Sequence, residues 1–301
     1  MQNRKAIVTL AIGQEYVDNW QKYCCPSWEK YAAKYDFDLI CLQRPLDTSL
    51  RAKQRSPAWQ KCLIFGQESV SKYEQVVWLD SDIIINESAP DLTFDVPPDK
   101  VGAVAEDAPY ADVYIKRACR RWPNVDITRT AREYHSRFGL PADCKRQINT
   151  GVLVLSPGFH RPLLEHVYYN YEDRGGTEWH YEQRPLSYEL VKNNLVYLMD
   201  RRFNVVLPHE EFQHYPFALL SPPPEEIQVF SLQDRIARKL RRMQSKLRVK
   251  LTGPALRLLQ TEVVNTIFQS SYFCHFGFNA MEKMPMVRQK AKAWWDVYSK
   301  P

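Results

Sequence analysis

The chain has 301 residues, of which 45% are hydrophobic and 25% charged, and its net charge is +6; this composition is typical of a globular protein with one large or two modest domains. We find no apolar stretch of membrane-spanning length and no pattern typical of a secretory signal, so we expect a cytoplasmic protein without a membrane span. Seven cysteines at no metal-ligand spacing favour reduced thiols over a disulfide framework.

Apolar patterns predict strands and helices that alternate along the first two thirds of the chain. Strands are expected at residues 5–13, 37–42, 76–85, 101–105 and 150–155. Helices are expected at 15–35, 55–72, around Leu164 and at 182–192. Strand followed by helix, repeated, predicts an α/β fold with a mostly parallel central sheet flanked by helices.

A proline-rich break at 221–225 precedes a basic region with helical spacing. Apolar residues recur every three or four positions over 232–251 and again over 256–267, which predicts a helical hairpin within 222–270. Residues 235–257 carry nine Lys or Arg and no acid. Such a helix can lie on an anionic membrane surface; the alternatives are an acidic partner, a lid over a site, or a packed helix with solvated charges. The sequence does not separate these alternatives. We expect peripheral membrane association, on the inner face, through 229–269, on the strength of the family resemblance described below.

The most informative stretch is 76–85, an apolar run that carries Asp80 and Asp82 in its middle. Carboxylates are costly to bury unless they are paired or hold a metal, and oxygen ligands suit a hard cation such as Mg²⁺ or Mn²⁺. Ligands of open α/β sheets bind beyond the carboxyl ends of the strands. The pattern therefore predicts a metal–diphosphate site; the alternative is a pair of carboxylates that cap a helix or form salt bridges at a strand end.

Several ordered blocks of the chain resemble glycosyltransferase family 8, the GT-A fold group that holds glycogenin and bacterial lipopolysaccharide galactosyltransferases. The resemblance rests on residues 8–13 with Tyr16, 78–82, 148–155, 182–183 with 202–204 downstream, and 275–277. It implies a GT-A (Rossmann-like) fold and a metal-dependent transferase. That enzyme moves a hexose from a nucleotide-diphospho-sugar, expected to be a UDP-sugar, to a glycan or glycolipid acceptor with retention of configuration. On this basis we expect a catalytic domain at 1–221, the hairpin at 222–270, and a segment at 271–301 that completes the site.

The resemblance also implies roles for individual residues. The implied metal ligands are Asp80, Asp82 and His275, and the imidazole favours Mn²⁺ over Mg²⁺. The implied contacts with the donor nucleotide and sugar are Thr9, Ala11, Tyr16, Lys61, Asp80, Glu106, Asp107 and Asn149. Tyr16 is expected to stack on the base, Lys61 to contact the diphosphate, and Asn149 to bond the sugar.

Each of these roles has a plainer alternative. Tyr16 is equally an ordinary half-buried helix residue, and Lys61 is read more readily as a solvated lysine. Asn149 can start a strand through an Asx turn. Acidic residues after a strand, such as Glu106 and Asp107, are commonly loop residues, and a lone histidine is more often structural.

Glu182 and Gln183 are the implied catalytic pair, beneath the anomeric carbon of the donor. Positive charge develops on the sugar ring there, and a carboxylate or amide on the opposite face would stabilise it. The family more often has Asp before this Gln, so Glu182 is a departure that changes the reach of the side chain. Whether Glu182 is a nucleophile or an electrostatic stabiliser stays open, and the alternative is a polar helix start with an acidic first turn.

Three other classes of protein compete with a transferase. A haloacid-dehalogenase-type phosphatase also uses Asp-x-Asp, but it needs Thr or Val where this chain has Ile84, and it places the motif near the chain start. The second is an inactive GT-A scaffold that binds nucleic acid or an anionic membrane through the basic region. Because no stacking motif accompanies that region, we expect no nucleic acid partner. A sugar-nucleotide binder without activity is the third.

Overall fold

The structure is a computed structural model that describes residues 5–106, 147–172, 181–215, 256–277 and 280–289. Within them, a six-stranded sheet has the order β2-β1-β3-β6-β5-β7, and β6 runs antiparallel to the other strands. Its strands are β1 (Lys5–Leu10), β2 (Phe37–Leu42), β3 (Gln75–Leu79), β5 (Val101–Ala105), β6 (Ile148–Leu155) and β7 (Val196–Leu198). The predicted mostly parallel sheet is confirmed.

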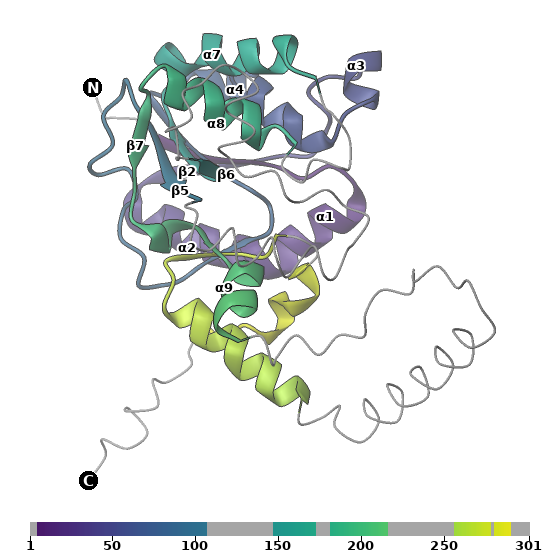
Figure 1. Cartoon of the computed structure of the whole chain (residues 1–301), viewed down its shortest axis with the longest axis vertical. Helices are drawn as coiled ribbons and strands as arrows, with labels where there is room; N and C mark the ends of the chain where they lie inside the picture. The colour runs from purple at the N-terminus through teal and green to yellow at the C-terminus, as the bar shows by residue number, and fades with distance from the viewer. Residues whose placement is uncertain (1–4, 107–146, 173–180, 216–255, 278–279, 290–301) are drawn as a thin grey trace, which may run out of the picture.

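Helices cover both faces of this sheet (Figure 1). Alternate side chains of one strand enter different cores: Ile7 packs with the helices on one face, and Ala6 and Val8 pack with those on the other. The first face carries α1 (Gln14–Asn19), the π-helix η1 (Trp20–Cys24) and α2 (Cys25–Tyr35). The second carries the 3₁₀ helix η2 (Pro57–Gly66), α4 (Glu68–Ser71), α7 (Pro157–Asn170) and α8 (Gln183–Lys192), with α3 (Leu50–Lys53) nearby.

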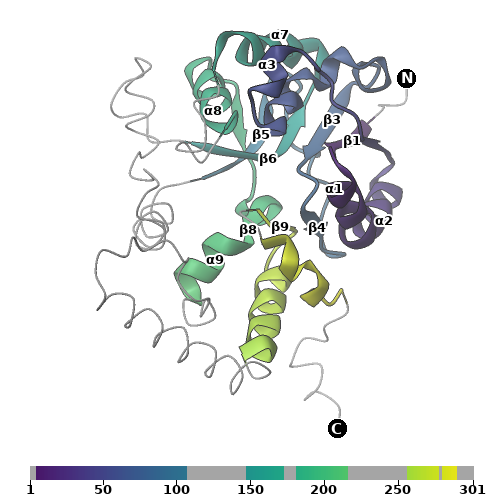
Figure 2. The same ribbon diagram turned by 90° about the vertical axis from the view of Figure 1, so that its right-hand side faces the viewer.

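A second, three-stranded sheet of order β4-β9-β8 lies below the first (Figure 2). Its strands are β4 (Ile83–Ile85), β8 (Val205–Val206) and β9 (Phe273–His275). Around it are the 3₁₀ helices η3 (Arg201–Asn204) and η5 (Ala280–Met286), α9 (Leu207–His214) and a helix at 256–269. Leu79 of the large sheet and Ile83 of the small sheet are buried in one common core.

The predicted strand at 76–85 is wrong in its extent, because it is two strands in different sheets. The chain leaves the large sheet after Leu79, turns through Asp80–Asp82, and enters the small sheet at Ile83. Both turn ends stay bonded, since the Asp80 N–H donates to Gly151 O at 2.9 Å and the Phe276 N–H donates to Asp82 O at 2.9 Å. The two carboxylates lie at the seam between the sheets, where they keep partial access to solvent.

Two predicted helices are wound differently from the expectation. The helix expected at 15–35 forms, but its middle turn is a π-helix in which the Cys25 N–H reaches back to Trp20 O. Pro26 has no N–H for the carbonyl four residues earlier, which favours this wider turn. The helix expected at 55–72 is instead η2 followed by the short α4.

The second helix of the predicted hairpin is present at 256–269, and the first, at 232–251, lies outside the described residues. Val264 and Phe268 of the described helix are buried in the same core as β4 and β9. None of the described helices combines the length and apolar character that a membrane span requires. The boundaries of the hairpin as a separate unit stay a prediction.

Candidate metal centre and adjoining cavities

Three potential metal ligands converge at the seam between the sheets. Asp80 follows β3, Asp82 precedes β4, and His275 ends β9, which pairs with β4 so that His275 lies opposite Ile83. His275 Nε2 lies 3.2 Å from Asp82 Oδ1 and 3.8 Å from Asp80 Oδ2. One ligand atom from each of the three residues lies within 4.8 Å of the others, so a single ion could contact all three.

The chemistry of this cluster fits a hard divalent cation. Asp82 Oδ1 is buried, and the described residues give it no hydrogen bond beyond the 3.2 Å ion-pair contact with His275 Nε2, so its charge is only partly compensated. Burial alone would lower the pKa of His275, but the charges of Asp82 and then Asp80 outweigh burial and raise it. Two carboxylates and one imidazole therefore make a site with net negative charge, and this donor set suits Mn²⁺.

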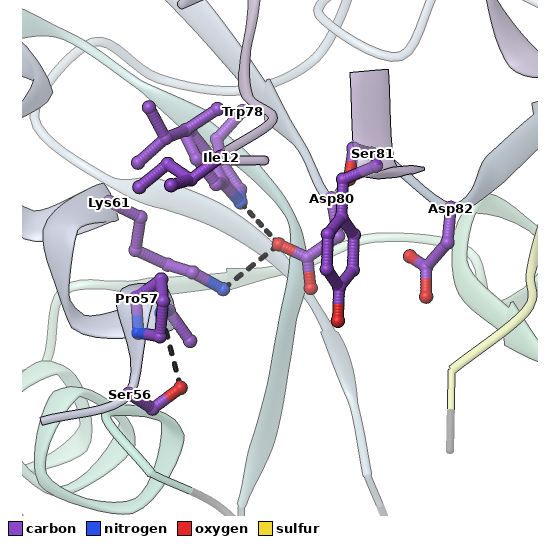
Figure 3. A pocket seen from close by; sticks show the side chains of 11 residues that line it. Ile12, Ser56, Pro57, Lys61, Trp78, Asp80, Ser81 and Asp82 are labelled. Carbon is purple, nitrogen blue, oxygen red and sulfur yellow. Dashed lines mark hydrogen bonds and ion pairs between the residues drawn. The ribbon is translucent and has the colours of Figure 1, made fainter. Parts of the chain in front are cut away.

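Only one oxygen of Asp80 faces the other ligands. Its Oδ1 accepts hydrogen bonds from Lys61 Nζ at 3.0 Å and Trp78 Nε1 at 2.8 Å (Figure 3). Burial opposes ionisation of Asp80, but the Lys61 ammonium outweighs it and lowers the pKa of the carboxyl. Asp80 is therefore held ionised, with Oδ2 left to face His275.

Lys61 is a buried ion-pair residue and not the solvated lysine that the sequence favours. Its side chain is 4% exposed, and Nζ lies 2.8 Å from Glu182 Oε1, which also accepts from Thr150 Oγ1 at 3.0 Å. The carboxylates of Asp80 and Glu182 raise the pKa of Lys61 against the opposing effect of burial. The sequence does contain an indication that Lys61 is buried, because it is the one charged residue in the otherwise apolar or neutral stretch 57–66.

Gln183 and Glu106 form a second polar cluster beside Glu182. The Gln183 amide accepts from the Thr150 N–H at 3.2 Å and donates to the Glu106 carboxylate, which also accepts from Gln147 Nε2 at 3.2 Å. Burial raises the pKa of Glu106 to about 7, although hydrogen bonds from Asn149 and Gln183 partly oppose it. Because β6 is antiparallel, its first residues lie at the same sheet edge as the carboxyl ends of β3 and β5.

Asn149 forms the Asx-turn hydrogen bond that was the structural alternative to a contact with the donor sugar. Its Oδ1 accepts from the Gly151 N–H at 2.9 Å, as in an Asx turn, and from Asn204 Nδ2 at 2.7 Å. Asn204 in turn lies 3.1 Å from His275 Nδ1. Asn204 has no role predicted from the sequence, although it is the last residue of the Arg202-Phe203-Asn204 block.

Two cavities lie in this region: the larger includes Asp80 and Asp82 in its wall, and the smaller includes Asn149 and Asn204. The larger, of about 230 Å³, is lined by Leu10, Ile12, Tyr16, Ser56, Pro57, Ala58, Lys61, Trp78, Asp80, Ser81 and Asp82 (Figure 3). The smaller, of about 90 Å³, is lined by Val104, Ala105, Glu106, Asn149, Arg201, Asn204, Val205, Val206, His209 and Glu210. Tyr16 is 49% exposed at the larger cavity, whereas Thr9 and Ala11 are buried at 0% and 1% exposed.

The structure thus brings most of the predicted site residues to one edge of the sheet. Asp80, Asp82 and His275 form the cluster, Lys61 and Glu182 lie behind Asp80, and Gln183 and Glu106 lie beside Asn149. Leu10, the last residue of β1, and Ile12, which follows the strand, line the larger cavity, whereas Thr9 and Ala11 are not among its lining residues. Asp107 lies outside the described residues.

Comparison with known proteins identifies the fold. No protein-family model and no curated protein sequence matches the chain. A glycosyltransferase involved in glycosylation of the major capsid of PBCV-1 aligns with a TM-score of 0.50 and 16% identity, over 94% of this chain and 100% of that one. The WbbM bifunctional glycosyltransferase aligns with a TM-score of 0.50 and 10% identity, over 99% of this chain and 52% of that one. The chain therefore has the mixed α/β fold of the GT-A glycosyltransferases.

Proposed function

We propose that the protein is a divalent-cation-dependent glycosyltransferase that uses a nucleotide-diphospho-sugar, with UDP-hexose as the expected donor and Mn²⁺ as the expected cation. The observation that carries the proposal is the Asp80–Asp82–His275 cluster at the wall of the larger cavity. A cation held by so few protein ligands has positions left for substrate phosphates. One fold can carry many activities, so this function is inferred from the residues of the site and not from the GT-A fold alone.

The larger cavity suits the nucleotide end of the donor. Tyr16 presents an exposed ring at its wall, on which a base can stack, and Asp80 and Asp82 place the diphosphate near the cation. When bound, the cation neutralises the charge that develops on the leaving diphosphate. Lys61 is directed at Asp80 and Glu182, so we assign it to fixing Asp80 in place of the direct diphosphate contact that the resemblance implied.

Glu182 is better suited to electrostatic stabilisation than to nucleophilic attack. Its side chain is 3% exposed, and its Oε1 is shared between Lys61 and Thr150. A carboxylate held in this way is a poor nucleophile, because its Oε1 is engaged by an ammonium and a hydroxyl and is not free to attack the anomeric carbon. We propose that Glu182 and Gln183 together supply negative potential and an amide dipole to the face where positive charge develops on the donor sugar, with retention of configuration.

The smaller cavity suits hydroxyl-rich groups. Glu106 and Asn149 offer oxygens and amide hydrogens on its wall, and Glu210 and Arg201 extend the polar lining. We propose that Glu106 and Asn149 contact donor hydroxyls there and that a glycan or glycolipid acceptor approaches from this side. A pKa of about 7 lets Glu106 donate as well as accept a hydrogen bond near neutrality.

Thermal-shift measurements with nucleoside diphosphates and their sugars, with and without Mn²⁺, test the proposal. A ligand that binds the native state raises its apparent stability, so we expect a donor-dependent shift that requires Mn²⁺ and the release of nucleoside diphosphate on turnover. Proton NMR of the product then reports the anomeric configuration. Failure of every nucleotide to bind with Mn²⁺ present would reject the proposal, and binding without turnover would favour an inactive sugar-nucleotide binder.

A peripheral membrane location is proposed on a separate observation. Leu258 and Leu259 are 61% and 41% exposed at the start of the helix at 256–269, next to the exposed Arg257 and directly after the basic stretch. Neighbouring exposed apolar and basic side chains suit an anionic bilayer surface. We expect Arg241→Glu with Arg242→Glu to reduce co-sedimentation with anionic vesicles, while Lys30→Glu leaves it unchanged; equal sedimentation of all variants would reject the membrane surface.

A further inference from the structure

Asn204 lies between the metal cluster and the amino-terminal end of β6. It ends η3 directly before β8, and β8 pairs with β9 so that Val206 lies opposite His275. The Asn204 side chain is buried, with 5% of the residue exposed. Its Oδ1 lies 3.1 Å from His275 Nδ1, and its Nδ2 donates to Asn149 Oδ1 at 2.7 Å.

The chemistry of the donors and acceptors fixes the direction of every bond in this chain of contacts. A backbone N–H can only donate, so the Gly151 N–H, 2.9 Å from the Asn149 side chain, identifies the contacted atom as the oxygen Oδ1. The Asn204 atom that faces Asn149 Oδ1 must then be the amide nitrogen. Asn204 Oδ1 therefore faces His275, and a carbonyl oxygen accepts, so His275 Nδ1 carries a proton.

We propose that Asn204 is a positioning residue that sets the tautomer of His275, so that Nδ1 keeps its proton and Nε2 is the nitrogen offered to the cation. This inference rests on the proposed metal site. Metal-binding histidines commonly have their second ring nitrogen fixed by a hydrogen-bond acceptor, which orients the ring. Here the acceptor is itself oriented by the Gly151 N–H acting through Asn149. A main-chain group of β6 thus determines which ring nitrogen can bind the ion.

Gly151 contributes to the same arrangement through its missing side chain. A Cβ at position 151 would lie 2.5 Å from His275 Cε1, 2.7 Å from Nδ1 and 3.0 Å from Asn149 Oδ1. The imidazole therefore lies against the bare backbone of β6, within reach of Asn204. Nε2 is then directed at Asp82 Oδ1, 3.2 Å away, and at Asp80 Oδ2, 3.8 Å away.

Nitrogen NMR of the histidine rings tests the tautomer directly. The full chain, labelled with ¹⁵N-histidine and loaded with diamagnetic Cd²⁺ as a substitute for Mn²⁺, should show for His275 a proton on Nδ1 and the metal on Nε2. His275→Gln identifies the resonances, since its spectrum loses them. A proton on Nε2, or metal on Nδ1, would overturn the inference. This experiment uses the wild-type chain and requires no variant of Asn204.

Mn²⁺ affinity, measured from the EPR signal of free Mn²⁺, tests the role of Asn204. We expect Asn204→Leu, which removes the acceptor with little change of shape, to weaken binding by about 10- to 100-fold. Asn204→Asp keeps an oxygen for the Nδ1 proton and should bind Mn²⁺ more tightly than Asn204→Leu. The control is Asn265→Leu, which removes a buried amide in the helix at 256–269 and should leave Mn²⁺ affinity unchanged.

The outcomes separate this inference from the proposed function. Wild-type affinity in folded Asn204→Leu would overturn the role of Asn204 while leaving the metal site intact. Equal weakening in Asn204→Leu and Asn265→Leu would also overturn it, because general destabilisation would then explain the loss. A wild-type protein that binds neither Mn²⁺ nor Cd²⁺ would overturn the metal site itself, and this inference with it.

Discussion

The ammonium of Lys61 and the carboxylate of Glu182 form a 2.8 Å ion pair in which the two side chains are 4% and 3% exposed. Asp80 shares the same ammonium at 3.0 Å. This trio joins η2, the end of β3 and the start of α8, three elements distant in the sequence. The negative charges of Asp80 and Glu182 are both balanced by Lys61. Replacing Lys61 should therefore cost more stability than replacing a lysine whose ion pair is exposed to solvent.

Lys61→Met should destabilise the protein by about 3 kcal/mol, because it leaves two carboxylates at a buried position without their common partner. Urea unfolding followed by circular dichroism measures the change. Lys30→Met is the matched control, since Lys30 also pairs with an acid, Glu87, at 2.7 Å but is 62% exposed; we expect a change below about 1 kcal/mol. Similar losses in both variants would contradict the assignment of a buried network.

Asp82→Ala should abolish Mn²⁺ binding and Mn²⁺-dependent transfer while the fold remains intact. Asp82 Oδ1 has no partner among the described residues beyond its 3.2 Å contact with His275 Nε2, which is itself a proposed ligand, so its loss removes a ligand and little structural support. Isothermal titration with Mn²⁺, a donor-hydrolysis assay and circular dichroism measure these effects. Asp95→Ala, at an exposed position, should behave like the wild type; full activity in Asp82→Ala would reject the metal assignment.

Gly151→Ala should impair Mn²⁺ binding more than it impairs folding. The added Cβ would stand 2.5 Å from His275 Cε1, so the imidazole must move away from Asp80 and Asp82. Gly158→Ala is the control, because a Cβ there meets no atom within 4 Å and alanine favours the helix α7 by up to about 1 kcal/mol. Unchanged Mn²⁺ affinity in Gly151→Ala would show that the ring does not need this close approach.

Glu106 should make stability depend on pH. Burial raises its pKa from 4.5 to about 7, so between these values the folded protein binds more protons than the unfolded chain. The free energy of unfolding should therefore fall as pH rises through this window and level off above it. Glu106→Gln cannot titrate, and urea unfolding at pH 5 and pH 8 should show a smaller decrease than in the wild type. Parallel profiles for the two proteins would contradict the raised pKa; exposed Glu74→Gln should follow the wild type.

Sequence patterns predict what local periodicity and turn chemistry encode. The strands at Phe37–Leu42 and Val101–Ala105 form with the predicted bounds, since short apolar or β-branched runs between polar residues leave few alternatives. The antiparallel direction of β6 could not be predicted in this way, because a buried strand has the same apolar pattern whether it runs parallel or antiparallel to its neighbours. The transfer of the chain between sheets at Asp80–Asp82 was hidden for a similar reason: both halves are buried strands.

The site shows the same division. Asp80 and Asp82 stand out because charge interrupts an apolar run, and the family resemblance added His275. The structure brings the three side chains together, and their role as metal ligands stays a prediction. Lys61 and Asn204 depend on tertiary contacts, with Glu182 in one case and with Asn149 and His275 in the other. Their roles follow from which atoms face each other across separate elements, and spacing along the chain carries no such information.

The ligand set of the metal cluster is divided between the two sheets, with Asp80 at the end of β3 and His275 within β9. An ion held there would link the two sheets. Removal of the ion by a chelator should weaken the contact between the sheets before it affects the hydrogen bonds within either one. Hydrogen exchange in β4 and β9 should then speed up on removal of the ion. A cation that served the proposed transfer would in that case also keep the two sheets together.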